Sequence, residues 1–322
     1  MPANEINPRR IDVHHHLMPP AYVKDATPER IFRDSPGQLR GPLEWTPERS
    51  IEEMDRCGIA TSITSIATPG VWFGDDAAAR RIARECNEYA ARMAVDHPGR
   101  FGVFASLPLP DVDASLREIE FALDTLDADG VVLMTSLRDR WPGDKAFAPV
   151  FDELNRRKAV VYVHPTVPEC CRNLSVGVAP ATIEFPMDTT RAIVSLLYSG
   201  TFVRCADIRF IFSHGGGMLP FVAERISRAP VMEPALAASV PNGAMHELKR
   251  LYYEIASATS PMALASLLQL VATTQVLFGT DYPFRRAAPT LEQLASYALT
   301  VADRAAIERN NALGLFPRFG RG

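Results

Sequence analysis

The sequence has few cysteines and no long run of apolar residues. Its five cysteines are odd in number and form no CxxC pair, which fits reduced thiols better than a disulfide framework. No apolar run approaches the roughly 20 residues of a membrane span, and the opening MPANEINPRR lacks the apolar core of a signal peptide. We therefore expect a cytoplasmic protein with no membrane partner. The cysteines are Cys57, Cys86, Cys170, Cys171 and Cys205. The adjacent pair is expected to pack in a loop.

Concentrated positive charge is also missing. The formal net charge is -4 and no block of Lys or Arg stands out, so nothing in the sequence suits nucleic acid or an anionic surface. Internal repeats and low-complexity tracts are absent as well. These absences leave a small molecule as the expected partner.

The composition is that of an ordinary globular protein, with 47% hydrophobic and 22% charged residues in a chain of 322. Such a chain can bury a large core. Its length allows one large domain, such as an α/β barrel of about 250 residues or more, or two medium domains.

Apolar, β-branched runs alternate with amphipathic stretches along the chain. Eight predicted strands, each followed by a predicted helix, imply parallel βαβ units and favour an α/β fold, a closed (β/α)8 TIM barrel over residues 1–322. An open doubly wound sheet is the alternative, but no GxGxxG loop follows the first strand. The strands are predicted over 11–16, 60–67, 101–109, 130–136, 159–165, 208–217, 251–257 and 274–283. The helices are predicted over 47–58, 75–96, 111–126, 147–158, 188–198, 262–271 and 303–316, with one more ending at Arg225.

Two irregular stretches interrupt this alternation. Residues 18–46, after the first strand, are punctuated by Pro and Gly and are predicted to form a lid or binding loop rather than helices. Residues 165–186 form a second irregular stretch after the fifth strand. The predicted barrel therefore carries inserted loops after strands 1 and 5.

Three consecutive histidines end the first predicted strand, in the run IDVHHH. Because side chains alternate along a strand, His14 and His16 share one face and His15 points to the other. Two imidazoles on a rigid strand suit the start of a divalent metal site, whereas an exposed cluster or a tag remnant is the simpler alternative. The apolar flanks Ile11 and Val13 favour a buried strand over a tag. A catalytic metal usually has at least three protein ligands, so other strand ends must supply the rest.

Further ligand types follow other predicted strands. The fifth, sixth and eighth strands end in His164, His214 and Asp281. In a TIM barrel the active site lies at the carboxyl ends of the strands, so these side chains should converge with the first pair. Four histidines and an aspartate exceed what core packing requires, and we predict a metal site there. The remaining strand ends offer only weak ligands, namely Ser106, Thr135 or Ser136, and Ser257.

The chain resembles the amidohydrolase superfamily, in particular its branch related to aminocarboxymuconate semialdehyde decarboxylase. The motifs that carry the resemblance are DVHHH, VYVHPT, IFSHGGGMLPFVAERI and LFGTDYPF, which span residues 12–284. Within that branch, GVWFGDD, SLPLPDVD and VVLMTS are most similar to 6-methylsalicylate decarboxylases and their relatives.

The resemblance implies that one divalent ion is bound by His14, His16, His164 and Asp281, with His214 beside it. Members with two metals often carry a bridging lysine at the end of the fourth strand, and the lysines of this chain, at 24, 145, 158 and 249, lie elsewhere. One ion is therefore expected. The donor set suits zinc best, with manganese and magnesium as alternatives.

The activity expected from the resemblance is non-oxidative decarboxylation of an aromatic hydroxy acid of the salicylate type. The carboxylate and phenolate oxygens would chelate the ion, Asp281 would protonate the ring carbon, and His214 would orient or transfer that proton. The same geometry also activates water, so a hydrolase or hydratase of a lactone, amide or unsaturated acid is the alternative. A barrel that binds metal or ligand without catalysis is a third interpretation.

Four further residues are candidates for substrate binding, and two more are weaker candidates. Arg225 lies eleven residues beyond His214, where relatives carry an arginine near the substrate carboxylate, although a surface helix residue is an equally good interpretation. Trp72 and Phe73 after the second strand, and Phe284 after the eighth, are expected to form aromatic walls for a ring substrate, or else to serve plain packing. Glu184 and Asp188 are weaker candidates. A homodimer or homotetramer is expected from the resemblance alone.

Overall fold

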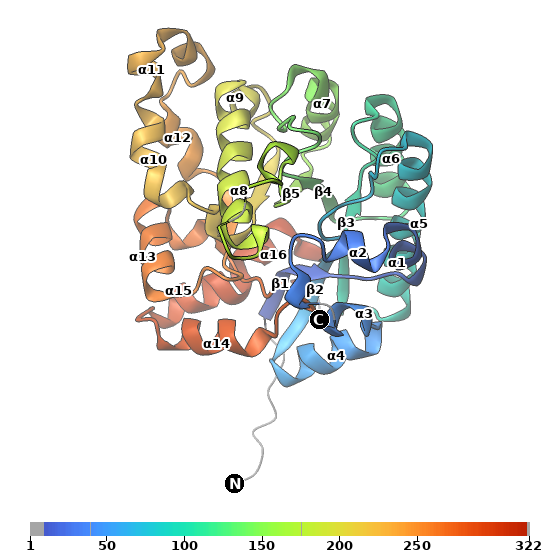
Figure 1. Cartoon of the computed structure of the whole chain (residues 1–322). Coiled ribbons are helices and arrows are strands. Elements are labelled where there is room, and N and C mark those ends of the chain that lie inside the picture. The colour runs from blue at the N-terminus through green and yellow to red at the C-terminus, as the bar shows by residue number, and fades with distance from the viewer. Residues whose placement is uncertain (1–9, 39, 175, 321–322) are drawn as a thin grey trace.

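The computed structural model describes residues 10–38, 40–174 and 176–320. Its core is one eight-stranded parallel sheet whose strands follow one another in chain order, β1 to β8, with helices between them (Figure 1). The strands are β1 Arg10–His16, β2 Ile59–Ser65, β3 Phe101–Ser106, β4 Gly130–Met134, β5 Val160–His164, β6 Arg209–Phe212, β7 Tyr252–Glu254 and β8 Val276–Leu277. This confirms the predicted α/β barrel and rules against the open doubly wound sheet.

The barrel closes where the chain after β8 meets β1. The backbone N–H of Val13 donates to the carbonyl of Phe278 at 3.0 Å, and that of His16 donates to Tyr282 at 2.7 Å. In the other direction Asp281 donates its N–H to the carbonyl of His14 at 2.8 Å. Strand β8 itself is much shorter than the predicted 274–283, because the chain leaves extended geometry before Asp281, whose φ is +67°.

A buried carboxylate, that of Asp12, holds this seam together. Its two oxygens accept hydrogen bonds from the backbone N–H of His14 at 3.0 Å and from Nδ1 of His15 at 3.1 Å. They also accept from the N–H of Thr280 at 3.1 Å and from its hydroxyl at 2.6 Å. Asp12 therefore joins the first strand to the segment that follows the last one.

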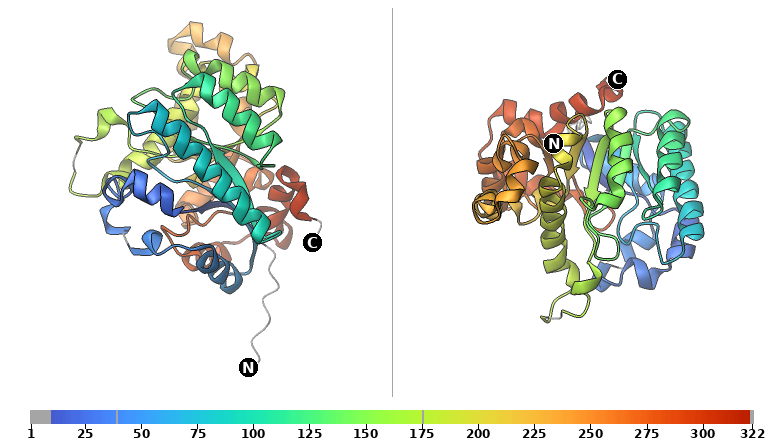
Figure 2. Two further views of the ribbon diagram at one scale, coloured as in Figure 1. Left: turned by 90° about the vertical axis from the view of Figure 1, so that its right-hand side faces the viewer. Right: turned by 90° about the horizontal axis from the view of Figure 1, so that it is seen from above.

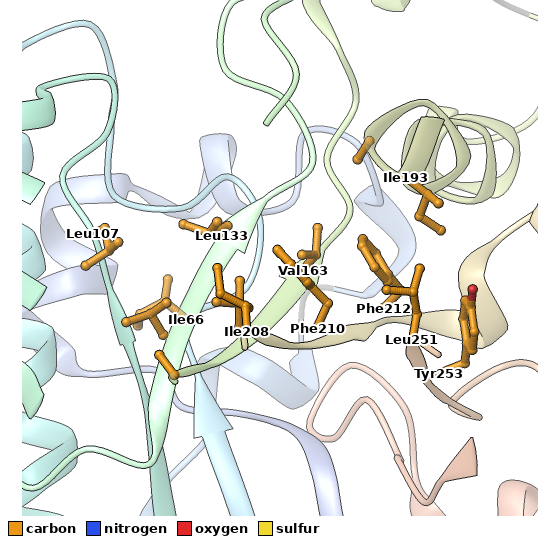
Figure 3. Packing of buried hydrophobic residues seen from close by; sticks show 14 of the residues in the cluster. Ile66, Leu107, Leu133, Val163, Ile193, Ile208, Phe210, Phe212, Leu251 and Tyr253 are labelled. Carbon is orange, nitrogen blue, oxygen red and sulfur yellow. The ribbon is translucent and has the colours of Figure 1, made fainter. Parts of the chain in front are cut away.

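The helices surround the strands and bury their outer faces (Figure 2). Figure 3 shows this packing, in which Ile193 of α8 and Phe212 of β6 belong to the same buried cluster. A second cluster joins strand side chains to the C-terminal segment, where Phe104 lies 5.8 Å from Phe316, ring centre to ring centre. The α-helices are α1 Pro20–Ala26, α2 Pro28–Ile31, α3 Arg40–Leu43, α4 Pro47–Arg56, α5 Asp76–Asp96, α6 Val112–Asp124, α7 Ala148–Arg156, α8 Pro180–Tyr198, α9 Thr201–Arg204, α10 Leu219–Ser227, α11 Ala229–Met232, α12 Ala244–Lys249, α13 Pro261–Leu270, α14 Ala287–Ser296, α15 Val301–Ala305 and α16 Asn311–Leu315.

The two insertions are more helical than predicted. Residues 18–46 contain α1, α2 and α3, so the prediction of a stretch without helices was wrong there. Prolines occupy the first turns of α1 and α2, where a missing N–H costs nothing, and Tyr22 and Ala26 bury one side of α1. Helix α8 begins at Pro180, eight residues before the predicted start at 188, because it continues through Pro186 instead of breaking there.

Among the described residues no helix is both long and apolar enough to cross a membrane. The organisation of residues 1–322 as a single domain stays a prediction.

We expect the substitution Asp12→Asn to lower the free energy of unfolding by about 1–3 kcal/mol, because it leaves buried donors of the seam without their charged acceptor. Chemical denaturation monitored by circular dichroism measures this. Asp207→Asn, a change of the same kind at an exposed position, is the control and should stay within about 0.5 kcal/mol of the parent. Equal unfolding midpoints for the two variants would contradict the role given to Asp12.

Candidate metal centre

Four buried side chains converge at the carboxyl ends of the strands. His14 and His16 come from β1, His164 ends β5, and Asp281 follows β8. One ligand atom from each lies within 4.8 Å of the others. The fold therefore brings together the four residues that the sequence assigns to a metal.

The ring nitrogens are oriented as metal ligands require. Nε2 of His14 and Nε2 of His16 face each other at 2.9 Å, and each lies 3.3 Å from Oδ1 of Asp281. On the opposite side of the rings, Nδ1 of His16 donates to the carbonyl of Ser65 at 3.2 Å, and Nδ1 of His164 donates to the carbonyl of Pro165 at 2.9 Å. With the Nδ1 proton held by an acceptor, Nε2 keeps its lone pair for a metal, so this donor set fits a divalent ion.

The buried carboxylates of the cluster carry negative charge that a bound cation would offset. Burial alone would lower the pKa of His14, but the carboxylates Glu254 and Asp281 outweigh it and raise that pKa to about 10. Burial lowers the pKa of His16 and, more strongly, that of His164, so both stay neutral. A proton on His14 thus offsets one of the two buried carboxylate charges, and a divalent cation in its place would offset both.

Glu254 is a functional residue that was not predicted from the sequence. Its Oε1 accepts from Nδ1 of His14 at 2.8 Å and from the N–H of His214 at 2.6 Å, and its Oε2 accepts from the N–H of Ala256 at 2.6 Å. The side chain is fully buried. The available signal was a charged residue inside the apolar run LYYEIAS, whereas the sequence prediction considered only Ser257 at the end of that strand.

His14, Glu254 and His214 also lie close enough to suggest a second ion site. However, Oε1 of Glu254 already accepts two hydrogen bonds and Oε2 a third. Glu254 thus orients its neighbours rather than offering a free ligand atom, and the cluster supports a single divalent ion.

His214 stands beside the cluster on its more open side. Its Nε2 lies 3.6 Å from Oδ2 of Asp281, and its Nδ1 has no hydrogen-bond partner among the described residues. The backbones of His214 and Asp281 have φ of +55° and +67°, an uncommon conformation for residues other than glycine and one that is often found at functional sites. Burial opposes ionisation of Asp281, yet His14, His16 and His214 hold its pKa well below the usual range.

His15 points away from the cluster. Its Nδ1 lies 3.1 Å from Oδ2 of Asp12 and its Nε2 lies 3.0 Å from Oγ of Ser50. Its ring therefore belongs to the hydrogen-bond network of the seam.

The residues predicted to bind substrate differ in whether they contact the metal cluster. Phe284 packs edge-on against His16, with ring centres 5.4 Å apart. Trp72 lies farther out, in a groove lined by arginines. Arg225 is exposed on α10, and within residues 10–38, 40–174 and 176–320 no hydrogen bond or ion pair joins its side chain to the cluster. Its role in substrate binding stays a prediction.

The two weaker candidates lie on α8. Asp188 accepts hydrogen bonds from the hydroxyl of Thr135 at 2.5 Å, from that of Ser136 at 2.9 Å and from the indole of Trp141 at 2.8 Å. Glu184 pairs with Arg191 at 3.1 Å. Asp188 therefore anchors the end of β4 to α8.

Comparisons with known proteins agree with this geometry. The family model described as amidohydrolase matches residues 11–318. The chain is 36% identical to a decarboxylase of Aspergillus niger, over 96% of this chain and 88% of that protein, and 34% identical to the 6-methylsalicylic acid decarboxylase of Penicillium expansum, over 96% of both. A crystal structure of 5-carboxyvanillate decarboxylase from Novosphingobium aromaticivorans, complexed with manganese, has the same fold, with a TM-score of 0.86 at 21% identity over 98% of this chain and 97% of that one.

The purified protein is expected to hold one equivalent of a divalent transition metal, which elemental analysis measures directly. His164→Ala and Asp281→Ala should each lose most of it, because each variant keeps only three of the four converging ligands. Full metal content in both variants would contradict the assignment of the cluster.

We expect Glu254→Gln to weaken metal binding by about 10- to 100-fold, because the amide no longer fixes the His14 ring as strongly or balances its charge. Competition with a chromophoric chelator measures the affinity. Glu247→Gln removes a similarly buried carboxylate that contacts Arg250 instead, and should bind metal as the parent does. Equal affinities in the two variants would show that Glu254 has no part in holding the ion.

Proposed function

This chain belongs to the amidohydrolase family, and on that basis we propose that it is a metal-dependent, non-oxidative decarboxylase of aromatic hydroxy acids of the salicylate type, such as 6-methylsalicylate. The observation that carries the proposal is the pair formed by Nε2 of His214 and Oδ2 of Asp281, 3.6 Å apart at the edge of the metal cluster. A ligand cluster next to a proton-transfer pair is what protonation of a ring carbon requires. Relatives that are 34% and 35% identical are described as 6-methylsalicylic acid decarboxylases, which supports the choice of substrate.

His14, His16, His164 and Asp281 are the residues that would hold the ion. When bound, a divalent ion polarises the oxygens of an acid and fixes its carboxylate and neighbouring hydroxyl in place. We propose zinc, since three imidazoles and one carboxylate suit it. Manganese, which a relative of the same fold contains, and magnesium are the alternatives.

The protein side chains then transfer one proton to the substrate. Because its pKa is held low, Asp281 is ionised at neutral pH and needs a neighbour to supply the proton that it passes on. His214 is that neighbour, since its Nε2 faces Asp281 while its Nδ1 is committed to no acceptor among the described residues. The proton passes from His214 to Asp281 and then to the ring carbon that bears the carboxylate. The bond to the carboxylate breaks, carbon dioxide leaves, and the electron pair returns to the ring.

Phe284 is proposed to hold the ring of the substrate. It is half-buried between His16, at 5.4 Å, and Phe32, at 6.1 Å, measured between ring centres. An aromatic side chain fixed edge-on beside a metal ligand presents an apolar surface to a substrate ring.

We also propose a homodimer or homotetramer, drawn from the resemblance, and a cytoplasmic location. Light scattering on the purified protein measures its oligomeric state.

The test is release of carbon dioxide from a panel of hydroxybenzoates, 6-methylsalicylate included, by protein whose metal content is known. We expect turnover that chelation abolishes and that metal restores, and a loss of about 100-fold or more in His214→Gln with metal still bound, because general acid catalysis contributes on that order. No release from any acid in the panel, together with cleavage of a lactone or amide, would replace the proposal with the hydrolase alternative.

A further inference from the structure

The groove that contains Trp72 carries more positive charge than its own carboxylates balance. It has a volume of about 230 Å³ and is lined by four arginines, which are Arg30, Arg33, Arg138 and Arg172. Two of them are paired: Arg172 contacts Asp34 at 3.1 Å and Glu169 at 2.5 Å, and Arg33 contacts Asp34 at 3.6 Å. Arg30 and Arg138 have no carboxylate partner in the part of the chain that the structure describes.

These two unpaired arginines are held by aromatic rings instead. The guanidinium carbon of Arg138 lies 4.1 Å from the ring centre of Trp72, and that of Arg30 lies 5.4 Å from the ring centre of Phe73. The indole N–H of Trp72 donates to Asp76 at 2.7 Å, which fixes the ring under Arg138. Stacking of this kind orients a guanidinium while leaving its N–H groups free to donate to an anion.

The backbone at Arg138 is unusual for an arginine. Leu137 and Arg140 exchange two backbone hydrogen bonds, at 2.9 and 3.0 Å, around a two-residue turn. The central residues Arg138 and Asp139 both have positive φ, +49° and +55°. Turns of this type favour Asn and Gly at these positions, because both central residues have positive φ. The backbone conformation therefore does not account for an arginine at position 138.

The groove borders the metal centre. Thr166 lines it only two residues beyond His164, a distance of at most about 7 Å along the chain. Ser136, from the end of β4, lines it as well. One wall of the groove therefore begins within two residues of a metal-ligand candidate, His164.

We propose that Arg30 and Arg138 form a binding site for a second anionic substituent, so that a second carboxylate on the ring improves a hydroxybenzoate as a substrate relative to unsubstituted salicylate. This inference rests on the proposed decarboxylase function. One carboxylate and its neighbouring hydroxyl bind at the metal centre, and the second carboxylate accepts charge-assisted hydrogen bonds from the two stacked guanidinium groups. Only the first carboxylate leaves.

The test compares salicylate with three of its four carboxylated forms, 2-hydroxyisophthalate, 4-hydroxyisophthalate and 2-hydroxyterephthalate. For at least one of the three, we expect the parent enzyme to have kcat/KM about tenfold or more above that for salicylate, the order of one charge-assisted hydrogen bond. Arg138→Gln and Arg30→Gln should each reduce that preference about tenfold, and Arg138→Lys should reduce it less. Arg228→Gln, which removes an exposed arginine paired with Glu224 on α10, is the control and should keep the preference.

A binding measurement separates this proposal from the decarboxylase function. Calorimetry on the metal-loaded protein compares isophthalate with benzoate, neither of which needs to react. If no acid in the panel releases carbon dioxide, but isophthalate binds more tightly than benzoate and Arg138→Gln removes the difference, the anion site stands and the proposed reaction fails. If the enzyme turns over salicylate, prefers none of the three diacids and binds isophthalate no better than benzoate, the anion site is overturned.

Discussion

The carboxylate of Asp12 is the constraint on which the rest of this structure depends. It lies at the junction where β1 and the segment after β8, far apart in sequence, must meet, and it accepts from donors on both sides of that junction. A parallel barrel has no hairpin to fix the register of its first strand against its last, so side-chain hydrogen bonds carry that specificity. Because His14 and Asp281 extend from the two sides of this seam, its register also determines the geometry of the metal centre.

The metal centre is an arrangement of buried charge that needs a cation. Glu254 and Asp281 are both held ionised despite burial, and His14 is the group that offsets them in the protein without metal. Ionised groups in an interior are costly unless they are paired and hydrogen-bonded. Two carboxylates and one divalent ion would leave the cluster neutral, with His16 and His164 as neutral donors. The same balance explains why Glu254 is as important as the ligands, although it would not touch the ion.

Much of this site can be predicted from the sequence, because the rules that apply to it are local. Alternation along a strand separates His14 and His16 from His15, and barrel topology places His164, His214 and Asp281 at the same end. Glu254 escapes this reasoning because β7 ends at Glu254, three residues before the predicted strand end at Ser257, so the prediction examined the wrong residue. Residues 18–46 escape it because α1, α2 and α3 are too short for a periodic pattern, and contacts with the rest of the barrel rather than propensity stabilise such helices. The surroundings of Trp72 could not be predicted either, since Arg30 lies in the insertion after β1 and Arg138 in the turn after β4, and the two meet only in the folded chain.

The ligands come from both ends of the chain, and this determines when the complete site can form during protein synthesis. A chain emerging from the ribosome presents His14 and His16 almost at once, but Asp281 becomes available only when nearly nine-tenths of the protein has been made. Until then no four-ligand site exists, and partial sites made of exposed histidines would hold an ion only weakly and without selectivity. The complete set of four ligands is thus available only in the finished barrel, after the last strand has closed on the first.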